Sequence, residues 1–309
     1  RGFHVSFEDV ILTSSTSEAY SFLFRLLVNA DEQILLPRPS YPLFDLLATL
    51  HDAVPRYYSL IHEDSDWQID LSGSVFGNMD QAKALICVNP NNPTGSYISE
   101  DVRKIVNHLT ADHGVALISD EVFWDYSFDE KVRESFVVNT GPLTFTLSGF
   151  SKVLGFPQLK LSWIVISGPE NQRREAKRRL EYIADTFLSV NTPVQNAAEH
   201  CFSFVDAIQM EIKERLLKNL QWAEEHLPAE YIEILKPQGG WSGLLLLKQG
   251  LSSEDVAYRL LTDYHVYIHP GYLFDFEDKE CLVLSLLLPH NEFAMGLGKF
   301  MDLCKTLKE

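Results

Sequence analysis

The sequence of 309 residues contains no run of 18 apolar residues, so we predict no membrane-spanning helix. Basic residues are scarce: 26 Lys and Arg stand against 43 Asp and Glu, for a net charge of −17, which disfavours a protein that binds nucleic acid phosphates. Cysteine is also scarce. The four cysteines are too widely spaced for a metal site, which predicts reduced thiols and a cytoplasmic location.

What is present is an ordinary globular composition, with 46% hydrophobic and 22% charged residues. Short apolar runs predict strands over Val10–Thr13, Gln33–Pro37, Ala84–Asn89, Val115–Asp120, Thr144–Ser148 and Ser162–Ser167. Amphipathic stretches predict helices over Ser17–Val28, Tyr41–His51, Ser99–Asp112 and Gln172–Phe187. Because strands alternate with helices, we predict an α/β domain with a mostly parallel sheet flanked by helices. Its ligands are expected beyond the carboxyl ends of the strands.

The pattern changes near residue 200. A long helix is predicted over Val194–Glu225, with a break near residues 201–203 left open. Further elements are predicted at Gly243–Lys248 and Cys281–Leu288, as strands, and at Ser253–Tyr264, as a helix. The length suggests about two domains. We therefore predict a large domain over residues 1–200 and a smaller α+β domain over residues 201–309.

The segment Thr13–Ala19 follows a predicted strand and opens a predicted helix. Ser15 and Glu18 fit a capping box, so the segment could serve only to cap the helix. Alternatively, the free N–H groups and the hydroxyls at the positive end of this helix bind a phosphate.

Two more segments leave predicted strands. Asn89–Gly95 contains two prolines and a glycine, which require a fixed turn, but its asparagines could also donate hydrogen bonds to a ligand. Asp120 ends the next predicted strand, where a carboxylate needs a cationic or protonated partner. A helix cap is the alternative interpretation of Asp120.

Lys152 comes just after the predicted strand Thr144–Ser148, and Lys160 follows eight residues later. A lone lysine is usually a surface residue. A lysine just beyond a buried strand is also well placed to act as a Schiff-base nucleophile.

Together and in this order, these segments resemble the class I and II aminotransferases, the fold-type I enzymes that depend on pyridoxal 5′-phosphate (PLP). The resemblance covers nearly the whole chain. It is carried by the strings Pro39-Ser40-Tyr41-Pro42, Asn89-Pro90-Asn91-Asn92-Pro93-Thr94-Gly95, Ser119-Asp120-Glu121, Ser151 to Lys160, Pro237-Gln238-Gly239-Gly240 and Pro270-Gly271.

The resemblance implies roles around the cofactor ring. Lys152 would form a Schiff base with PLP and, once released, would shuttle a proton. Asp120 would pair with the pyridine nitrogen and keep the ring protonated. Asn92 would donate to the phenolic oxygen, and Tyr41 would stack on the ring face.

For the cofactor phosphate, the resemblance implies the backbone N–H groups of Ser15 and Thr16 together with Ser151 and Lys160. Lys160 stands where the family commonly has an arginine, and Gly149 stands where it often has a serine. Phe123 replaces a tyrosine beside the cofactor oxygen, so we expect a raised pKa for the Schiff base.

Val283 occupies the place of the arginine that grips the substrate α-carboxylate in this family. Arg38 and His290 are weak candidates to replace it. Because a bidentate clamp is hard to replace, the sequence leaves open a PLP-dependent lyase or cyclase besides an aminotransferase.

A catalytically inactive PLP-fold module is a further alternative, disfavoured because Lys152, Asp120 and Asn92 are all retained. The resemblance implies a homodimer that acts on a small amino donor and a keto acceptor. His265 and His269 lie on a strand-like segment and would not share a helix face, so no metal site is predicted.

Family members carry several dozen residues before the phosphate-binding turn, which begins here at Thr13. We therefore expect the sequence, which starts at Arg1, to be part of a longer protein. The part given is expected to be poorly active by itself.

Overall fold

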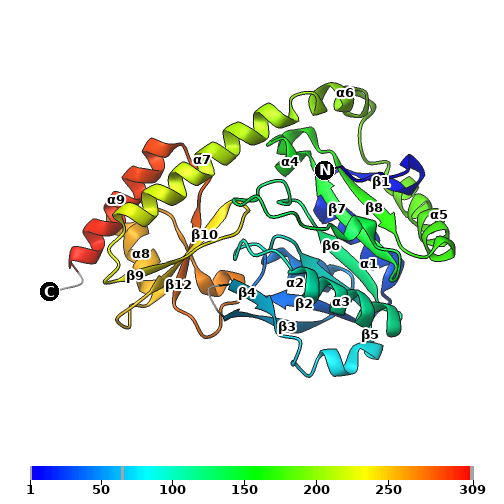
Figure 1. Ribbon diagram of the computed structural model, residues 1–309, viewed down its shortest axis with the longest axis horizontal. Coiled ribbons are helices and arrows are strands. Elements are labelled where there is room, and N and C mark those ends of the chain that lie inside the picture. Colours follow the sequence, from blue (N-terminus) through cyan, green and yellow to red (C-terminus); the bar gives the residue numbers. More distant parts are fainter. Residues whose placement is uncertain (1, 64–65, 307–309) are drawn as a thin grey trace.

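The computed structural model describes residues 2–63 and 66–306, so Arg1 lies outside it. Figure 1 shows a large sheet and a small sheet, with a long helix leading from one to the other. The large sheet contains β1 (Val10–Thr13), β2 (Gln33–Arg38), β3 (Val54–Glu63), β4 (Asp66–Ile69), β5 (Ala82–Val88), β6 (Ala116–Asp120), β7 (Thr144–Gly149) and β8 (Ser162–Ser167). The small sheet contains β9 (Ile232–Leu235), β10 (Ser242–Leu247), β11 (His269–Pro270) and β12 (Cys281–Ser285). The α-helices are α1 (Thr16–Leu27), α2 (Leu43–Leu50), α3 (Glu100–Asp112), α4 (Phe150–Val153), α5 (Glu170–Phe187), α6 (Thr192–Phe202), α7 (Val205–His226), α8 (Ser253–Tyr264) and α9 (His290–Thr306).

The large sheet has the strand order β1-β8-β7-β6-β5-β2-β3-β4. Its centre, from β7 to β3, is parallel, whereas β8, β1 and β4 pair antiparallel toward the two edges. Every residue of β6 is buried, as expected for a strand that is covered on both faces. The predicted α/β class with a mostly parallel sheet is thereby confirmed.

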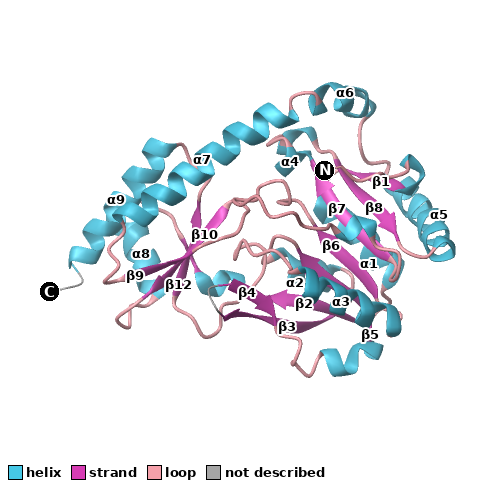
Figure 2. Cartoon of the chain, viewed as in Figure 1, coloured by secondary structure: helices cyan, strands magenta, loops and turns pink. Residues whose placement is uncertain are grey.

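Helices lie against both faces of the large sheet (Figure 2). One core packs beneath α1, α2 and α5, and the other packs beneath α3. Alternate residues of a strand serve the two cores: Ile118 belongs to the first and Leu117 to the second. The two cores fix the strands from both faces of the sheet. The candidate functional side chains lie at or just beyond the carboxyl ends of these strands.

The small sheet is antiparallel, in the order β11-β12-β10-β9, and shares a core with α7, α8 and α9. This arrangement confirms the predicted smaller α+β domain. The helix predicted over residues 194–225 is two helices, α6 and α7, because the chain turns at Ser203 and Phe204. The 22 residues of α7 span about 33 Å. The boundary near residue 200 falls within α6 and stays a prediction.

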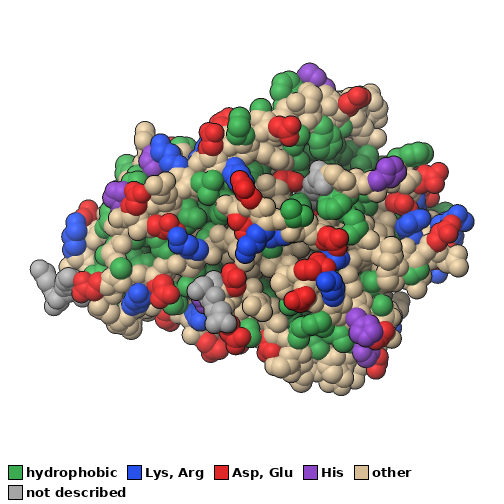
Figure 3. Space-filling model, in the orientation of Figure 1, with side chains coloured by type: hydrophobic (Ala, Val, Ile, Leu, Met, Phe, Trp, Pro, Cys, Tyr) green, Lys and Arg blue, Asp and Glu red, His purple; other side chains and the backbone are tan. Residues whose placement is uncertain are grey.

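In the large sheet, β3 and the edge strand β4 beside it were not predicted. Pro55 and several polar residues interrupt the apolar pattern of β3, and only Tyr58 of this strand is buried. On the face that Figure 3 shows, Lys and Arg side chains lie interspersed with Asp and Glu.

Candidate active site

A cavity of about 280 Å³ opens at the carboxyl ends of β5, β6 and β7, against the N-terminus of α1. Parallel sheets bind ligands at this end of their strands. The predicted site residues that line this cavity are Ser15, Thr16, Tyr41, Asn92, Asp120, Phe123, Ser151 and Lys152. Segments far apart in the sequence therefore meet at one place, as the resemblance implied.

Lys160 is the predicted site residue that is not among those lining the cavity. It follows the short helix η4 (Pro157–Leu159) and has a left-handed backbone, with φ 52° and ψ 52°. Its role at a phosphate stays a prediction.

The N-terminus of α1 is capped as the sequence predicts. The Ser15 hydroxyl accepts a hydrogen bond from Glu18 N at 3.1 Å, and the Glu18 carboxylate accepts one from Ser14 N at 2.7 Å. Ser15, Thr16 and Ser17 also line the cavity. The capping and ligand-binding interpretations of this segment are therefore compatible, because the positive end of a 12-residue helix faces the open space.

Asp120 is the buried acid of the cavity. Its Oδ2 accepts a hydrogen bond from the hydroxyl of Tyr20 at 3.0 Å, and its Oδ1 accepts one from Val122 N at 3.2 Å. Burial raises the pKa of Asp120 to about 6, although these hydrogen bonds and the charge of Lys152 act in the opposite direction. A cationic partner in the cavity would relieve this cost of burial.

Tyr20 is a cavity residue that sequence reasoning missed. It lies on α1, one turn beyond the cap, and its ring packs edge-on against Phe44 with centroids 5.2 Å apart. Burial and the neighbouring Asp120 raise the pKa of Tyr20 well above its usual value, so its hydroxyl stays a donor. Tyr20 lies within the predicted helix Ser17–Val28, and nothing in that pattern indicates its distant acidic partner.

Lys152 lies on α4, the short helix that follows β7. Burial lowers the pKa of Lys152, and the charge of Asp120 partly offsets this effect. The chain reaches this position through a close contact at Gly149, where a Cβ atom would lie only 2.1 Å from the Ser162 hydroxyl oxygen. A serine at position 149 would not fit this backbone without movement.

The three asparagines of the loop after β5 divide their roles. Asn89 Oδ1 accepts a hydrogen bond from Ile98 N at 3.0 Å, and Asn91 Oδ1 accepts one from the Thr94 hydroxyl at 3.0 Å. These two side chains hold the loop in place, in agreement with the fixed turn that the sequence predicts. Asn92 lines the cavity, so it is the asparagine available to a ligand.

Tyr41 and Phe123 supply aromatic surface to the cavity. Tyr41 is 47% exposed at its rim, whereas Phe123 is buried and packs edge-on against Trp241, with centroids 5.4 Å apart. Trp241 precedes β10 and was not predicted as a site residue. The Pro-Gln-Gly-Gly string beside it was the signal that could have pointed to it.

Val283 is buried in the core of the small sheet, with Leu244, Phe274 and Phe276. Among the described residues that line the cavity, Lys152 carries the cationic side chain. Neither weak substitute for the family arginine lies there. Arg38 pairs with Glu277 at 2.8 Å, and His290 Nδ1 lies 2.9 Å from the side-chain oxygen of Asn219.

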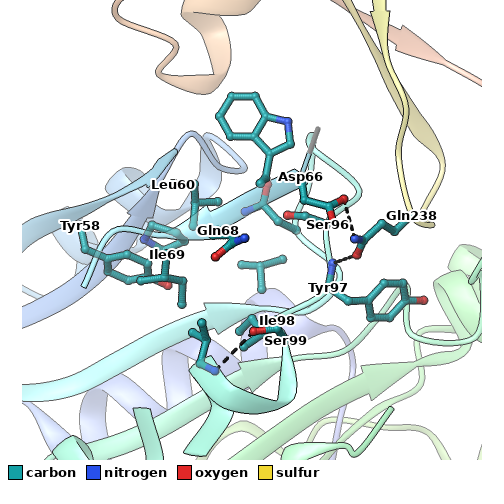
Figure 4. Close-up of a pocket in the computed structure, with 15 residues that line it drawn as sticks. Tyr58, Leu60, Asp66, Gln68, Ile69, Ser96, Tyr97, Ile98, Ser99 and Gln238 are labelled. Carbon is teal, nitrogen blue, oxygen red and sulfur yellow. Dashed lines mark hydrogen bonds between the residues drawn. The ribbon is translucent and has the colours of Figure 1, made fainter. Parts of the chain in front are cut away.

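A second cavity, of about 70 Å³, lies between the large sheet and the segment that precedes β10 (Figure 4). Gln238 closes one side of it. The side-chain Nε2 of Gln238 donates to Asp66 Oδ1 at 2.9 Å, and its Oε1 accepts from Tyr97 N at 2.9 Å (Figure 4). This small cavity marks a seam between the two parts of the molecule.

Within residues 2–63 and 66–306, each helix is either too short or too polar to span a membrane. In the same residues, no group of three or more His, Cys, Asp or Glu side chains is placed to hold a metal ion.

Comparison with known proteins agrees with this geometry. The family model described as aminotransferase class I and II matches residues 3–297. The chain is 27% identical to the glutamate-pyruvate aminotransferase AlaA of Escherichia coli over 197 residues, which are 63% of this chain and 48% of that protein. It is 26% identical to an alanine aminotransferase of Mycobacterium tuberculosis over 287 residues, 91% of this chain and 61% of that protein.

Among solved structures, the alanine aminotransferase of Pyrococcus furiosus superimposes with a TM-score of 0.85 and 26% identity, over 97% of this chain and 78% of that one. The chain thus spans about half to three fifths of the length of these curated relatives and about three quarters of this solved one. The match of the family model over residues 3–297, together with this fold, shows that the chain belongs to the class I and II aminotransferase family.

Proposed function

We propose that this protein is a PLP-dependent aminotransferase, which exchanges an amino group between a small amino donor and a keto acceptor. One observation carries the proposal: Lys152 and the buried Asp120 line the same cavity, against the N-terminus of α1. Family membership and relatives named as alanine and glutamate-pyruvate aminotransferases support it.

The residues present fit PLP. An aldehyde needs an amine, a pyridine nitrogen needs an acidic partner, and a phosphate needs several hydrogen-bond donors. The cavity offers the Lys152 amine for the aldehyde and the Asp120 carboxyl for the pyridine nitrogen. The N-terminus of α1 and the Ser151 hydroxyl offer donors for the phosphate. When bound, PLP supplies an electron sink for the carbanion that forms at the substrate Cα.

Asp120 would hold a proton on the pyridine nitrogen. Its burial makes an unpaired carboxylate costly, so an ion pair with a protonated ring is favoured there. Tyr20 keeps Asp120 in place, because its hydroxyl donates to the oxygen that Val122 N does not use. The carboxylate is therefore oriented before a ligand arrives.

Lys152 would act first as the nucleophile and then as the base that moves a proton at the substrate Cα. The lowered pKa of Lys152 favours the neutral amine that both tasks require. Tyr126 fixes the backbone beneath it, because its hydroxyl donates to Lys152 O at 2.6 Å. This bond holds the helix that carries the amine.

The remaining cavity residues would bind and orient the cofactor. The N–H groups of Ser15 and Thr16 and the hydroxyl of Ser151 would hold the phosphate, and Lys160 would supply a positive charge. Asn92 would donate to the phenolic oxygen, and the exposed ring of Tyr41 would cover one face of the pyridine. We further propose a cytoplasmic homodimer, as is common in the family.

The test uses the full-length protein. It is incubated with PLP, reduced with borohydride and digested, and we expect a stable adduct on the peptide that contains Lys152. A screen of amino donors should then convert the bound cofactor to its amine form, and a keto acceptor should restore it. Release of ammonia and a keto acid from the donor alone would instead show a lyase, and the absence of any adduct would show an inactive module.

A further inference from the structure

A tryptophan from the small-sheet part of the chain contacts the cavity lysine. Nζ of Lys152 lies 4.7 Å from the centroid of the Trp241 ring and 5.3 Å from that of the Phe123 ring. The two rings themselves meet nearly edge to face, at an interplanar angle of 62°. Both distances are within the roughly 6 Å at which an aromatic face attracts an ammonium group. The amine therefore lies against two aromatic faces.

Backbone hydrogen bonds hold the segment that carries Trp241. Phe128 N donates to Gln238 O at 2.8 Å, and Gly240 N donates to Tyr126 O at 3.0 Å. On its other side, Gly239 N donates to Gly95 O at 3.0 Å. The segment therefore bridges the loop that contains Asn92 and the loop that follows Asp120.

The bridge needs glycine on both sides. Gly95 has a φ of +69°, and a Cβ atom there would lie 2.4 Å from the Cβ of Pro237. A Cβ atom on Gly239 would lie 2.5 Å from Tyr126 O. Beyond this seam, the Gln238 side chain adds the hydrogen bonds to Asp66 and Tyr97 that Figure 4 shows. The indole is thus placed by the backbone, with little freedom to move away from the cavity.

Trp241 contacts Lys152 through the face of its indole ring and not through its N–H group. Its Nε1 is buried and makes no hydrogen bond within the described residues. A buried N–H group without a partner is unfavourable, and a phenylalanine would not carry one. Indole is, however, the aromatic group that binds a cation most strongly through its face. The contact with Lys152 offers a reason for an indole here.

Tyr126 links the indole to the lysine. Its ring packs on Trp241 with centroids 5.3 Å apart, and its hydroxyl donates to Lys152 O at 2.6 Å. The same side chain therefore fixes both the backbone of the lysine and the ring that its amine contacts.

We propose that Trp241 is a positioning residue, whose indole face, together with Phe123, holds the Lys152 ammonium at the wall of the cavity between its chemical tasks. The proposal rests on the function proposed above, in which Lys152 must be released and then act again. In this proposal, a residue next to the small sheet contacts the Lys152 amine directly.

Other groups near the Lys152 amine also shift its pKa. Burial lowers the pKa of Lys152, and Asp120 is the described charged group that raises it. Tyr20 acts on Asp120 rather than on the amine, because its hydroxyl is bonded to the carboxylate. Two aromatic faces favour the ammonium over the neutral amine. A leucine in place of the indole keeps an apolar wall against Lys152 but removes the aromatic face, so the amine should become easier to deprotonate.

The experiment measures how the reactivity of Lys152 depends on pH. The full-length protein, freed of cofactor, is labelled with trace acetic anhydride across a pH series, and the Lys152 peptide is quantified by mass spectrometry. For Trp241→Leu we expect the pH midpoint of Lys152 labelling to fall. At pH values below that midpoint, labelling should rise roughly two- to fivefold. Trp241→Phe keeps an aromatic face, so its pH midpoint should lie closer to that of the wild type than the midpoint of Trp241→Leu does.

Trp222→Leu is the matched control, since Trp222 stacks on His226 with centroids 4.3 Å apart and is also half-buried. It should leave the midpoint unchanged. If Trp241→Leu does not fold, Phe123→Leu removes the other face and should lower the midpoint in the same way. An unchanged midpoint, or faster labelling at every pH without a moved midpoint, would overturn the proposal. Because no cofactor is present, this readout is independent of whether wild-type protein forms a borohydride adduct.

Discussion

Replacing Asp120 with asparagine should stabilise the cofactor-free protein while abolishing its chemistry. Asp120 is 7% exposed, and burial raises its pKa from 3.8 to about 6. A carboxyl whose pKa is raised on folding binds its proton more tightly in the folded state. The folded protein therefore loses stability as the pH rises from about 4 through about 6, and the loss is complete above that.

The magnitude follows from the difference in pKa. A difference of about two pKa units corresponds to about 3 kcal/mol at pH 8. By pH 5 about half of this loss is already present, so the stability gained by Asp120→Asn should grow by about 1.5 kcal/mol between pH 5 and pH 8. The amide keeps the shape of the carboxyl, and it can still accept from Val122 N and bond the Tyr20 hydroxyl.

The assay is urea unfolding of the wild type and of Asp120→Asn, both without cofactor, at several pH values. Glu199→Gln on the surface of α6 is the control, because an exposed carboxylate keeps its water on folding. A free-energy difference between Asp120→Asn and the wild type that stays flat across this pH range would refute the reasoning. With saturating PLP the order should reverse, because the wild type alone keeps the ion pair with the ring.

Three further predictions concern the cavity and its supports. Lys152→Ala should give no borohydride-stable adduct and should lose at least ~100-fold in turnover, measured with the best amino donor. Phe123→Tyr should lower the pH midpoint of the cofactor's visible absorbance, because a phenol would donate to the cofactor oxygen; an unmoved midpoint would contradict this. Gly149→Ala should cost about 1–3 kcal/mol in urea unfolding, because its Cβ would lie 2.1 Å from the Ser162 hydroxyl oxygen. Gly298→Ala on α9, where nothing lies within 4 Å, should instead be neutral or stabilising.

Much of the fold could be predicted because it depends on local patterns. The apolar run of β6 and the proline-rich turn after β5 are visible in the sequence, and both strands end where expected within two residues. Asp120, which ends a buried strand, and Lys152, which follows one, were predicted as site residues from the motifs that carry the resemblance. Strand β3 was missed, since Pro55 and several partly exposed polar residues weaken its pattern.

The rest depends on contacts between distant segments. Tyr20 lies a hundred residues from Asp120 in the chain, and nothing in either segment indicates their hydrogen bond. Trp241 meets Lys152 only because a glycine-lined seam brings the two parts of the molecule together. Asn89, Asn91 and Asn92 are equivalent by type, and only the structure separates those that hold the loop from the one that lines the cavity.

The central claim is that Lys152 is the residue that carries PLP. The most direct measurement is peptide mass spectrometry of the full-length protein after incubation with PLP and reduction with borohydride. The account predicts a phosphopyridoxyl group on the Lys152 peptide, which is lost when an amino donor is added before the reduction. An adduct on another lysine, on Lys160 for example, or no adduct at any lysine, would contradict it.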